Sequence, residues 1–201
     1  MRSTPISQQE ATAVGVAWPL PQGEWTYEDW CKLPDDGYRY EVITGVLYVS
    51  PPPSIRHQRI SIALVGHLLD FLKLQPLGEV LTAPVGVRLP HQSVPLQPDI
   101  VFVRTERLGI VGEAYVEGAP DLLVEILSPS NWLYDRREKM QAYQEAGVAE
   151  YWIVDPRALT IEVYVLEQGT YVLMGQYRIG EVAHSQVLPG FEVSVETIFP
   201  H

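Results

Sequence analysis

The chain has 201 residues, 46% of them hydrophobic and 19% charged, which fits one globular domain with a sizeable core; no apolar run is long enough to span a membrane. Its single cysteine, Cys31, excludes an internal disulfide and a thiolate zinc site, and favours a reducing, cytoplasmic location. The formal net charge of −11 opposes broad electrostatic affinity for nucleic acid.

Residues 1–22 are rich in Ser, Thr, Gln, Ala and Pro without a period, and we expect a poorly ordered arm there. Pro19 and Pro21 interrupt the short apolar stretch near its end, so a secretory signal is not expected. Residues 23–201 are expected to form a single domain.

The first elements of this domain have clear local signals. Thr26, followed by Asp29 three residues later, predicts the start of a short helix. Residues 39–50 predict a β-hairpin with its turn at Thr44–Gly45. Apolar residues at helical spacing predict a long amphipathic helix over residues 54–74.

The middle of the chain is mainly β-rich. Two β-branched runs occupy residues 79–89 and 97–103, and residues 104–118 are expected to be irregular. Residues 121–127 are almost continuously apolar, which is typical of a strand buried on both faces.

A helix is predicted from Ser130 to Ala146, with Gly147 as its C-terminal stop. It connects residues 121–127 to a strand at 151–154 and is long enough to cross between parallel strands. Further strands are predicted at 161–166, 171–177 and 191–195. The order of elements predicts an α/β (α+β) fold, a mixed sheet flanked by helices with a β-rich C-terminal extension.

Two carboxylates lie within apolar strand sequences. Asp99 precedes Ile-Val-Phe-Val, and Glu125 stands between Val124 and Ile126. A buried carboxylate is costly unless a cation compensates it. Two such strands in one domain therefore suggest a shared hard divalent metal, with the backbone carbonyl of Ile126 as a further oxygen ligand.

The helix that follows places Asp135, Lys139 and Tyr143 at a spacing of four, on one stripe. If this stripe packs over the carboxylate strands, the Lys139 ammonium can reach the metal-bound water.

Together, Pro98-Asp99, the VEILSPS block around Glu125, Lys139 and the EYWIVDP block resemble the PD-(D/E)XK nuclease superfamily. Within it, they are most similar to the Uma-type restriction endonuclease family, from about Tyr38 to Phe199. This resemblance implies a restriction-endonuclease-like fold and Mg²⁺-dependent hydrolysis of phosphodiester bonds in DNA, with Mn²⁺ as the alternative ion.

The superfamily pattern has a lysine two residues after the second acid, where this chain has Leu127. In the Uma-type family the lysine lies on the following helix, and Lys139 matches it. The resemblance also matches Glu41 to the acid of a YE-(I/L)-x-x-G block, and His57 to a family histidine.

The implied site has three groups of residues. The catalytic group is Asp99, Glu125, Lys139 and Glu41. The metal ligands are Asp99, Glu125 and the Ile126 carbonyl. Contacts to phosphate or to the ligands are assigned to His57, Asp135, Tyr143 and Arg136.

Each of these side chains also has a purely structural interpretation. Glu125 would form a buried salt bridge with an arginine, and Asp99 would be a turn residue. Lys139 would be exposed and paired with Asp135, and His57 would be a solvated helix residue.

Two other functions compete with a nuclease. The lysine missing at position 127 and the acidic charge favour a catalytically inactive nuclease fold that acts as a binding or interaction module. A hydrolase of small phosphate esters is the third option.

The remaining expectations concern partners. DNA binding is expected to be weak and confined to a local basic surface of Arg56, Arg59, Arg136, Arg137 and Lys139. A homodimer would suit double-strand cleavage, because two centres can address two strands.

Overall fold

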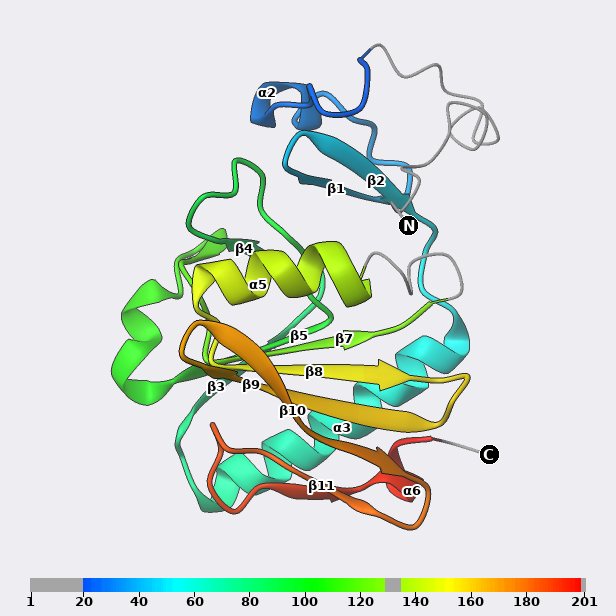
Figure 1. Cartoon of the computed structure of the whole chain (residues 1–201), viewed down its shortest axis with the longest axis vertical. Helices are drawn as coiled ribbons and strands as arrows, with labels where there is room; N and C mark the ends of the chain where they lie inside the picture. Colours follow the sequence, from blue (N-terminus) through cyan, green and yellow to red (C-terminus); the bar gives the residue numbers. More distant parts are fainter. Residues whose placement is uncertain (1–19, 129–134, 200–201) are drawn as a thin grey trace.

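The computed structural model describes residues 20–128 and 135–199 of the chain, and its centre is one six-stranded sheet (Figure 1). The strand order is β10-β9-β8-β7-β5-β3; β7 and β8 are parallel, and the other neighbours are antiparallel. The strands are β3 (Gly78–Thr82), β5 (Ile100–Arg104), β7 (Leu122–Ile126), β8 (Glu150–Asp155), β9 (Thr160–Glu167) and β10 (Thr170–Arg178). The predicted mixed sheet flanked by helices is confirmed.

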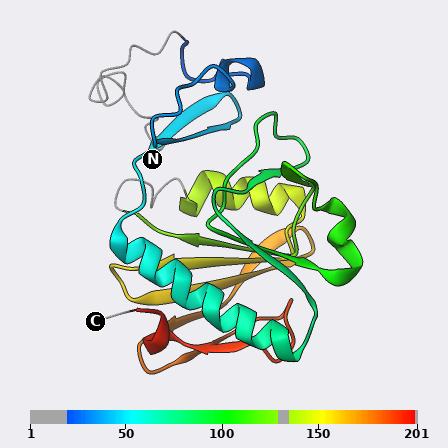
Figure 2. The same cartoon turned by 180° about the vertical axis from the view of Figure 1, so that it is seen from behind.

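Helix α3 (Ile55–Leu74) runs across one face of the sheet (Figure 2). The Ser54 side chain accepts a hydrogen bond from the His57 amide at its N-terminus, and Ile60, Leu64 and Leu68 are fully buried. Their spacing is the one predicted from the sequence. The same core includes residues of β11 (Val182–His184), β12 (Glu192–Ser194) and α6 (Val195–Ile198).

The opposite face carries a π-helical turn, η2 (Asp135–Lys139), that continues as α5 (Met140–Ala146). Gly147 ends α5 with φ of 85°, as predicted, because a left-handed conformation favours glycine. Buried Ala142 and Tyr143 pack in a core with side chains of β5, β7 and β8. The same core reaches a two-stranded parallel pair, β4 (Gly86–Arg88) and β6 (Tyr115–Glu117). Residues 130–134 of the predicted helix lie outside the described residues.

A small N-terminal unit lies beside α5 at the upper end of Figure 1. It contains α2 (Tyr27–Trp30), capped reciprocally by Thr26 and Asp29, and the antiparallel pair β1 (Arg39–Ile43) and β2 (Val46–Ser50). Both predicted elements are confirmed. The Gln22 side chain bonds both backbone groups of Leu47, whereas residues 1–19 of the expected arm lie outside the described part of the chain.

Two sequence expectations in the middle of the chain are wrong in detail. The run 79–89 is two strands in different sheets, because the chain leaves β3 at Thr82 and passes Ala83–Pro84 before β4. The segment 104–118, expected to be irregular, contains the 3₁₀ helix η1 (Thr105–Ile110) and β6. Short elements such as these depend on tertiary contacts, so their local sequence signal is weak.

Candidate active site

The Glu125 side chain points from the central strand β7 toward α5. Its Oε1 lies 2.9 Å from Lys139 Nζ and accepts a 2.6 Å hydrogen bond from the Tyr143 hydroxyl. All three residues have 0% exposure. The compensating cation is therefore a lysine rather than an arginine, and the structural interpretation of Lys139 as an exposed residue is wrong.

Glu41 is the second carboxylate on this lysine. Its Oε2 lies 3.1 Å from Lys139 Nζ, and its Oε1 accepts a 2.8 Å hydrogen bond from the Gln97 amide. Glu41 is buried in β1, so the hairpin supplies one side of the site. Lys139 bridges carboxylates from two separate sheets, an arrangement that no local pattern in the sequence predicts.

Asp99 lies one residue before β5 and is also buried. Its Oδ2 accepts a 2.8 Å hydrogen bond from the Ile126 amide and lies 3.1 Å from His57 Nε2, and its Oδ1 lies 3.3 Å from Arg39. Pairing of Ile100 with Val124 brings Asp99 beside the end of β7. Burial by itself would raise the pKa of Asp99. The His57 bond, the Arg39 charge and the Ile126 amide together hold that pKa below its ordinary value, so Asp99 is ionised.

Arg39 joins the two halves of the site, and sequence reasoning missed it. Its guanidinium lies near Asp99 and 3.8 Å from Glu41 Oε2, and it donates to the Gln97 carbonyl at 2.9 Å. A continuous polar network therefore runs from His57 to Tyr143. The available signal was the two-residue spacing of Arg39 and Glu41, which places both on one face of β1.

Tyr143 serves as a donor to Glu125. Burial and the adjacent Glu125 charge raise the pKa of Tyr143 well above its ordinary value, so its proton is retained.

Tyr143→Phe should lower the free energy of unfolding by about 1.5–3 kcal/mol, the usual cost of losing a hydrogen bond to a charged group. Urea denaturation measures this change, with the exposed Tyr38→Phe as control. Equal stability of the two variants would show that the hydroxyl adds nothing.

Two other expected residues lie outside this network or cannot be placed. Arg136 forms a bidentate pair with Glu162 at 2.7 and 2.9 Å and lies 3.7 Å from Asp155. The structure describes the backbone of Asp135 as part of η2, and its side chain lies outside the described set.

The expected basic surface needs correction. Arg56, Arg59 and Arg137 are exposed, whereas Lys139 is buried among carboxylates and cannot belong to a surface.

The Arg136–Glu162 pair provides a pH prediction. Burial would raise the pKa of Glu162, but bonds from Arg136 and Tyr164 bring that pKa below its ordinary value of 4.5. A lowered folded-state pKa means that the carboxylate stabilises the fold above pH 4.5, and that this stability is lost as pH falls from there. Glu162→Gln should therefore flatten the acid limb of unfolding free energy against pH. An unchanged slope between pH 5 and 3 would contradict this assignment.

The donor chemistry of the network fits a hard divalent cation. Three carboxylates (Glu41, Asp99 and Glu125) face two permanent cations (Arg39 and Lys139), which leaves one excess negative charge. Carboxylate oxygens are the ligands that Mg²⁺ and Mn²⁺ prefer. As described, however, these oxygens contact protein cations, and residues 20–128 and 135–199 contain no group of three or more His, Cys, Asp or Glu side chains placed so that it could hold a metal ion. An ion would therefore have to compete with Arg39 and Lys139 for the carboxylates.

A cleft of about 1140 Å³ opens beside the network. Arg39, His57 and Asp99 line it, together with the exposed face of α3 and Arg157. Glu125 and Lys139 are fully buried and do not belong to this lining.

The sheet and its flanking helices define an α+β protein, and the carboxylate–lysine network is buried beside that sheet. The chain belongs to the Uma2 family, described as "Putative restriction endonuclease", which it matches over residues 26–196. This confirms the resemblance drawn from the sequence.

Comparison with solved structures agrees with this fold. A protein from Anabaena variabilis ATCC 29413, described as "a putative nuclease belonging to DUF820", aligns with a TM-score of 0.70 at 20% identity. The match covers 87% of this chain and 97% of that one. No functionally curated protein is detectably similar. Among the described helices, none has the length and hydropathy of a membrane span.

Proposed function

We propose that the chain is a metal-dependent endonuclease that hydrolyses phosphodiester bonds in DNA. The observation that carries this proposal is a buried network in which Lys139 pairs with Glu41 and Glu125, and Arg39 pairs with Glu41 and Asp99. Its members come from β1, the residue before β5, β7 and η2, so four separate parts of the chain meet at one place. Membership of a family described as "Putative restriction endonuclease" supports this reaction class.

In this proposal Asp99, Glu125 and the Ile126 carbonyl hold a Mg²⁺ or Mn²⁺ ion. The bound ion supplies a Lewis acid that screens the phosphate and activates water. Lys139 is fully buried, so in this proposal its positive charge stabilises the negative charge that develops on the phosphate from behind the ligands rather than by direct contact. Glu41 holds the Lys139 ammonium in place, while Tyr143 and His57 orient the carboxylates of Glu125 and Asp99 through their hydrogen bonds.

The proposal is tested by incubating supercoiled plasmid with the purified protein. Nicking is expected with Mg²⁺ or Mn²⁺, little with Ca²⁺, and none with EDTA, because calcium tolerates loose coordination whereas magnesium requires octahedral placement of its water. Phosphate release from p-nitrophenyl phosphate without nicking would instead favour a small phosphate ester as substrate. Nicking that persists in EDTA would contradict metal dependence.

A catalytically inactive nuclease fold that serves as an interaction module is the second candidate. One observation favours it: the three carboxylates already pair with Lys139 and Arg39, as they would in a purely structural ion cluster. Calorimetric titration with Mn²⁺ separates the two candidates. Binding that weakens on Asp99→Asn supports the nuclease, and absence of binding supports the module.

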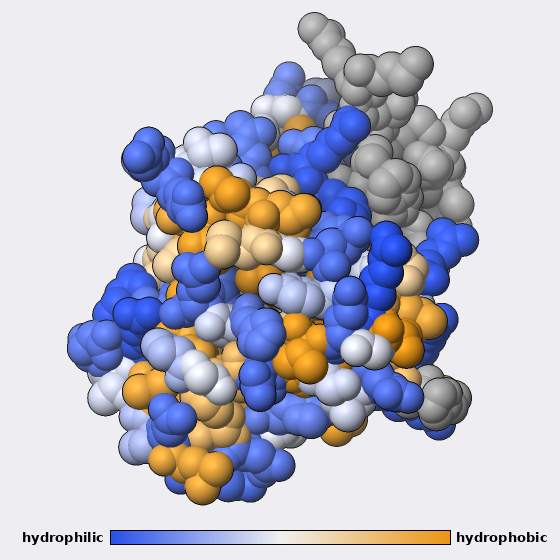
Figure 3. All heavy atoms as spheres, turned by 60° about the horizontal axis from the view of Figure 1, so that its bottom comes forward, coloured by the Kyte–Doolittle hydropathy of each residue, from blue (hydrophilic) through white to orange (hydrophobic). Residues whose placement is uncertain are grey.

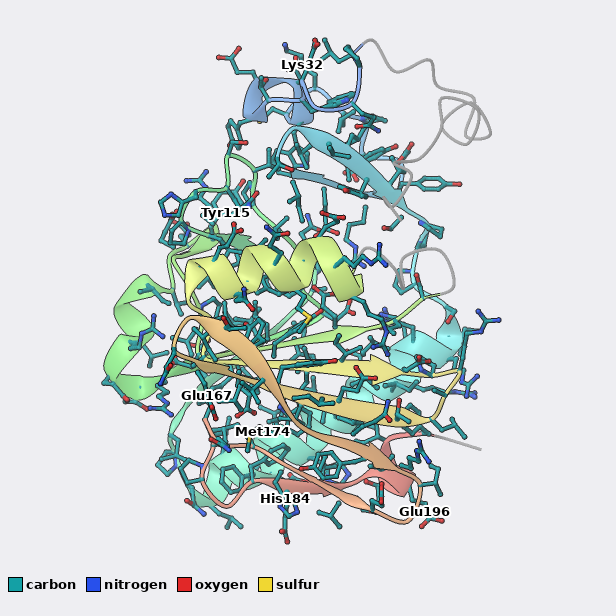
Figure 4. All side chains as sticks on the ribbon, viewed as in Figure 1. Lys32, Tyr115, Glu167, Met174, His184 and Glu196 are labelled. Carbon is teal, nitrogen blue, oxygen red and sulfur yellow. The ribbon has the colours of Figure 1, made fainter. Side chains whose placement is uncertain are left out.

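Oligomeric state remains a prediction, and we propose the homodimer on the basis of function. Exposed apolar residues Val172, Leu173 and Met174 lie on the edge strand β10. Figure 3 brings this end of the molecule forward and shows apolar residues in separate patches with hydrophilic residues between them. Figure 4 shows Met174, a residue of β10, in the lower half of the view and far from Lys32 of the N-terminal unit. Light scattering after gel filtration measures the mass directly.

A further inference from the structure

The cleft beside the network has an apolar wall on α3, in which Ile62 and Leu69 are exposed and Val65 also packs against the core. On α3 this wall contains Ile62, Val65 and Leu69, at a spacing of three and then four residues. The opposite side of the helix supplies the core, whereas Ile62 is 69% exposed and Leu69 is 45% exposed. Exposed Tyr38 lines the same cleft from the segment before β1.

The charges of the cleft differ in sign from those of the whole protein. Its lining contains three arginines (Arg39, Arg56 and Arg157) and two aspartates (Asp35 and Asp99), so the permanent charges give an excess of one positive charge, in a chain whose formal charge is −11. Arg56 and Arg157 are exposed, and neither forms a side-chain ion pair within the part of the chain that the structure describes. This cleft therefore opposes a polyanion less than most of the remaining surface of the acidic chain does, and Arg56 and Arg157 are placed to contact phosphates.

An apolar wall next to arginines suits an unpaired strand better than a duplex. In a duplex, the flat faces of the bases are stacked inside, and the outside presents phosphates and polar base edges. A single strand exposes its base faces, which proteins cover with aromatic and apolar side chains while basic residues follow the backbone.

The dimensions agree with this arrangement. From His57 to Leu69 the helix rises about 18 Å, at about 1.5 Å per residue. At about 3.4 Å per nucleotide of one strand, that length accommodates about five stacked nucleotides. The end of the cleft at His57 and Asp99 is the end that reaches the proposed metal site.

We infer that the cleft binds a single-stranded DNA segment, with base faces on Tyr38, Ile62 and Leu69 and phosphates on Arg56 and Arg157. This inference rests on the proposed nuclease function and specifies its substrate as an unpaired strand or the unpaired part of a larger DNA. The cleft lining contains none of the β10 residues Val172, Leu173 and Met174 considered for the homodimer, so the two proposals use different surfaces.

Fluorescence anisotropy tests this inference. The affinity for a labelled 15-nucleotide single strand is compared with the affinity for a hairpin whose duplex stem contains the same sequence. Both are measured in EDTA, so that binding is observed without cleavage. The single strand should bind at least about tenfold more tightly than the duplex. Tyr38→Ala should weaken single-strand binding by about tenfold, as expected for one lost stacking contact. Ile62→Ser/Leu69→Ser should have a similar effect, with the melting temperature unchanged.

The matched control is Leu74→Ser, since Leu74 lies on the same helix, is 85% exposed and is absent from the cleft lining. It should bind like the natural protein. Equal or tighter duplex binding would overturn the inference, as would unaltered binding by the Ile62/Leu69 variant. If that variant instead converts a dimer to a monomer, the apolar wall is a subunit interface. Plasmid nicking without single-strand preference would refute only the substrate inference, whereas single-strand binding without nicking would refute only the nuclease.

Discussion

Replacing Glu125 with glutamine should reduce plasmid nicking by at least about 10³-fold while DNA binding is retained or slightly improved. Glutamine keeps the shape of the side chain but removes the negative charge that a divalent ligand needs. Lys139 remains compensated by Glu41 at 3.1 Å, so the fold should tolerate the change. Binding should not weaken, since a negative charge near the phosphate site is lost.

Initial nicking rates and anisotropy on the same preparations measure both effects. Glu167→Gln is the control. Glu167 is exposed at the end of β9, so this substitution removes an equal charge far from the network. Nicking at the natural rate by Glu125→Gln would indicate a contaminating nuclease and support the inactive interaction module.

Replacing Lys139 with methionine should abolish nicking and lower the free energy of unfolding by about 3–5 kcal/mol. The ammonium is fully buried between Glu41 and Glu125, so its removal leaves two buried carboxylates without their shared cation. Adding Glu41→Gln to this variant should recover part of the stability but none of the activity, because one of the two carboxylates becomes neutral.

Urea denaturation gives the stability difference. Lys73→Met provides the matched control: Lys73 is exposed and pairs with exposed Asp70, so a change within about 0.5 kcal/mol is expected. A loss below about 1 kcal/mol for Lys139→Met would mean that the ammonium is solvated rather than buried, contrary to the site described.

The parts of the fold that local patterns specify could be predicted from the sequence. The helical spacing in α3, the capping pair of α2, the Thr44–Gly45 turn and the continuous apolar run of β7 each show their structure within a few residues. The same holds for the two carboxylates, since an acid in an apolar strand is conspicuous wherever the strand lies.

The remaining parts depend on contacts between distant segments. Arg39 and Gln97 meet across 58 residues, and nothing near either one reveals the other. Lys139 resembles a solvated helix lysine until the hairpin places Glu41 against it. Glu150, fully buried, is a further example. It accepts bonds from Trp152 and from the amides of Gln186 and Val187, a structural role that its strand sequence does not indicate.

Anomalous diffraction from crystals soaked in Mn²⁺ tests the central claim most directly. We expect one strong peak contacted by the Asp99 and Glu125 carboxylates, with the Arg39 or Lys139 side chain displaced from its present carboxylate partner. A map with no peak there, and with the Lys139–Glu125 and Arg39–Asp99 pairs unchanged at an Mn²⁺ concentration that supports nicking, would contradict the proposed metal centre.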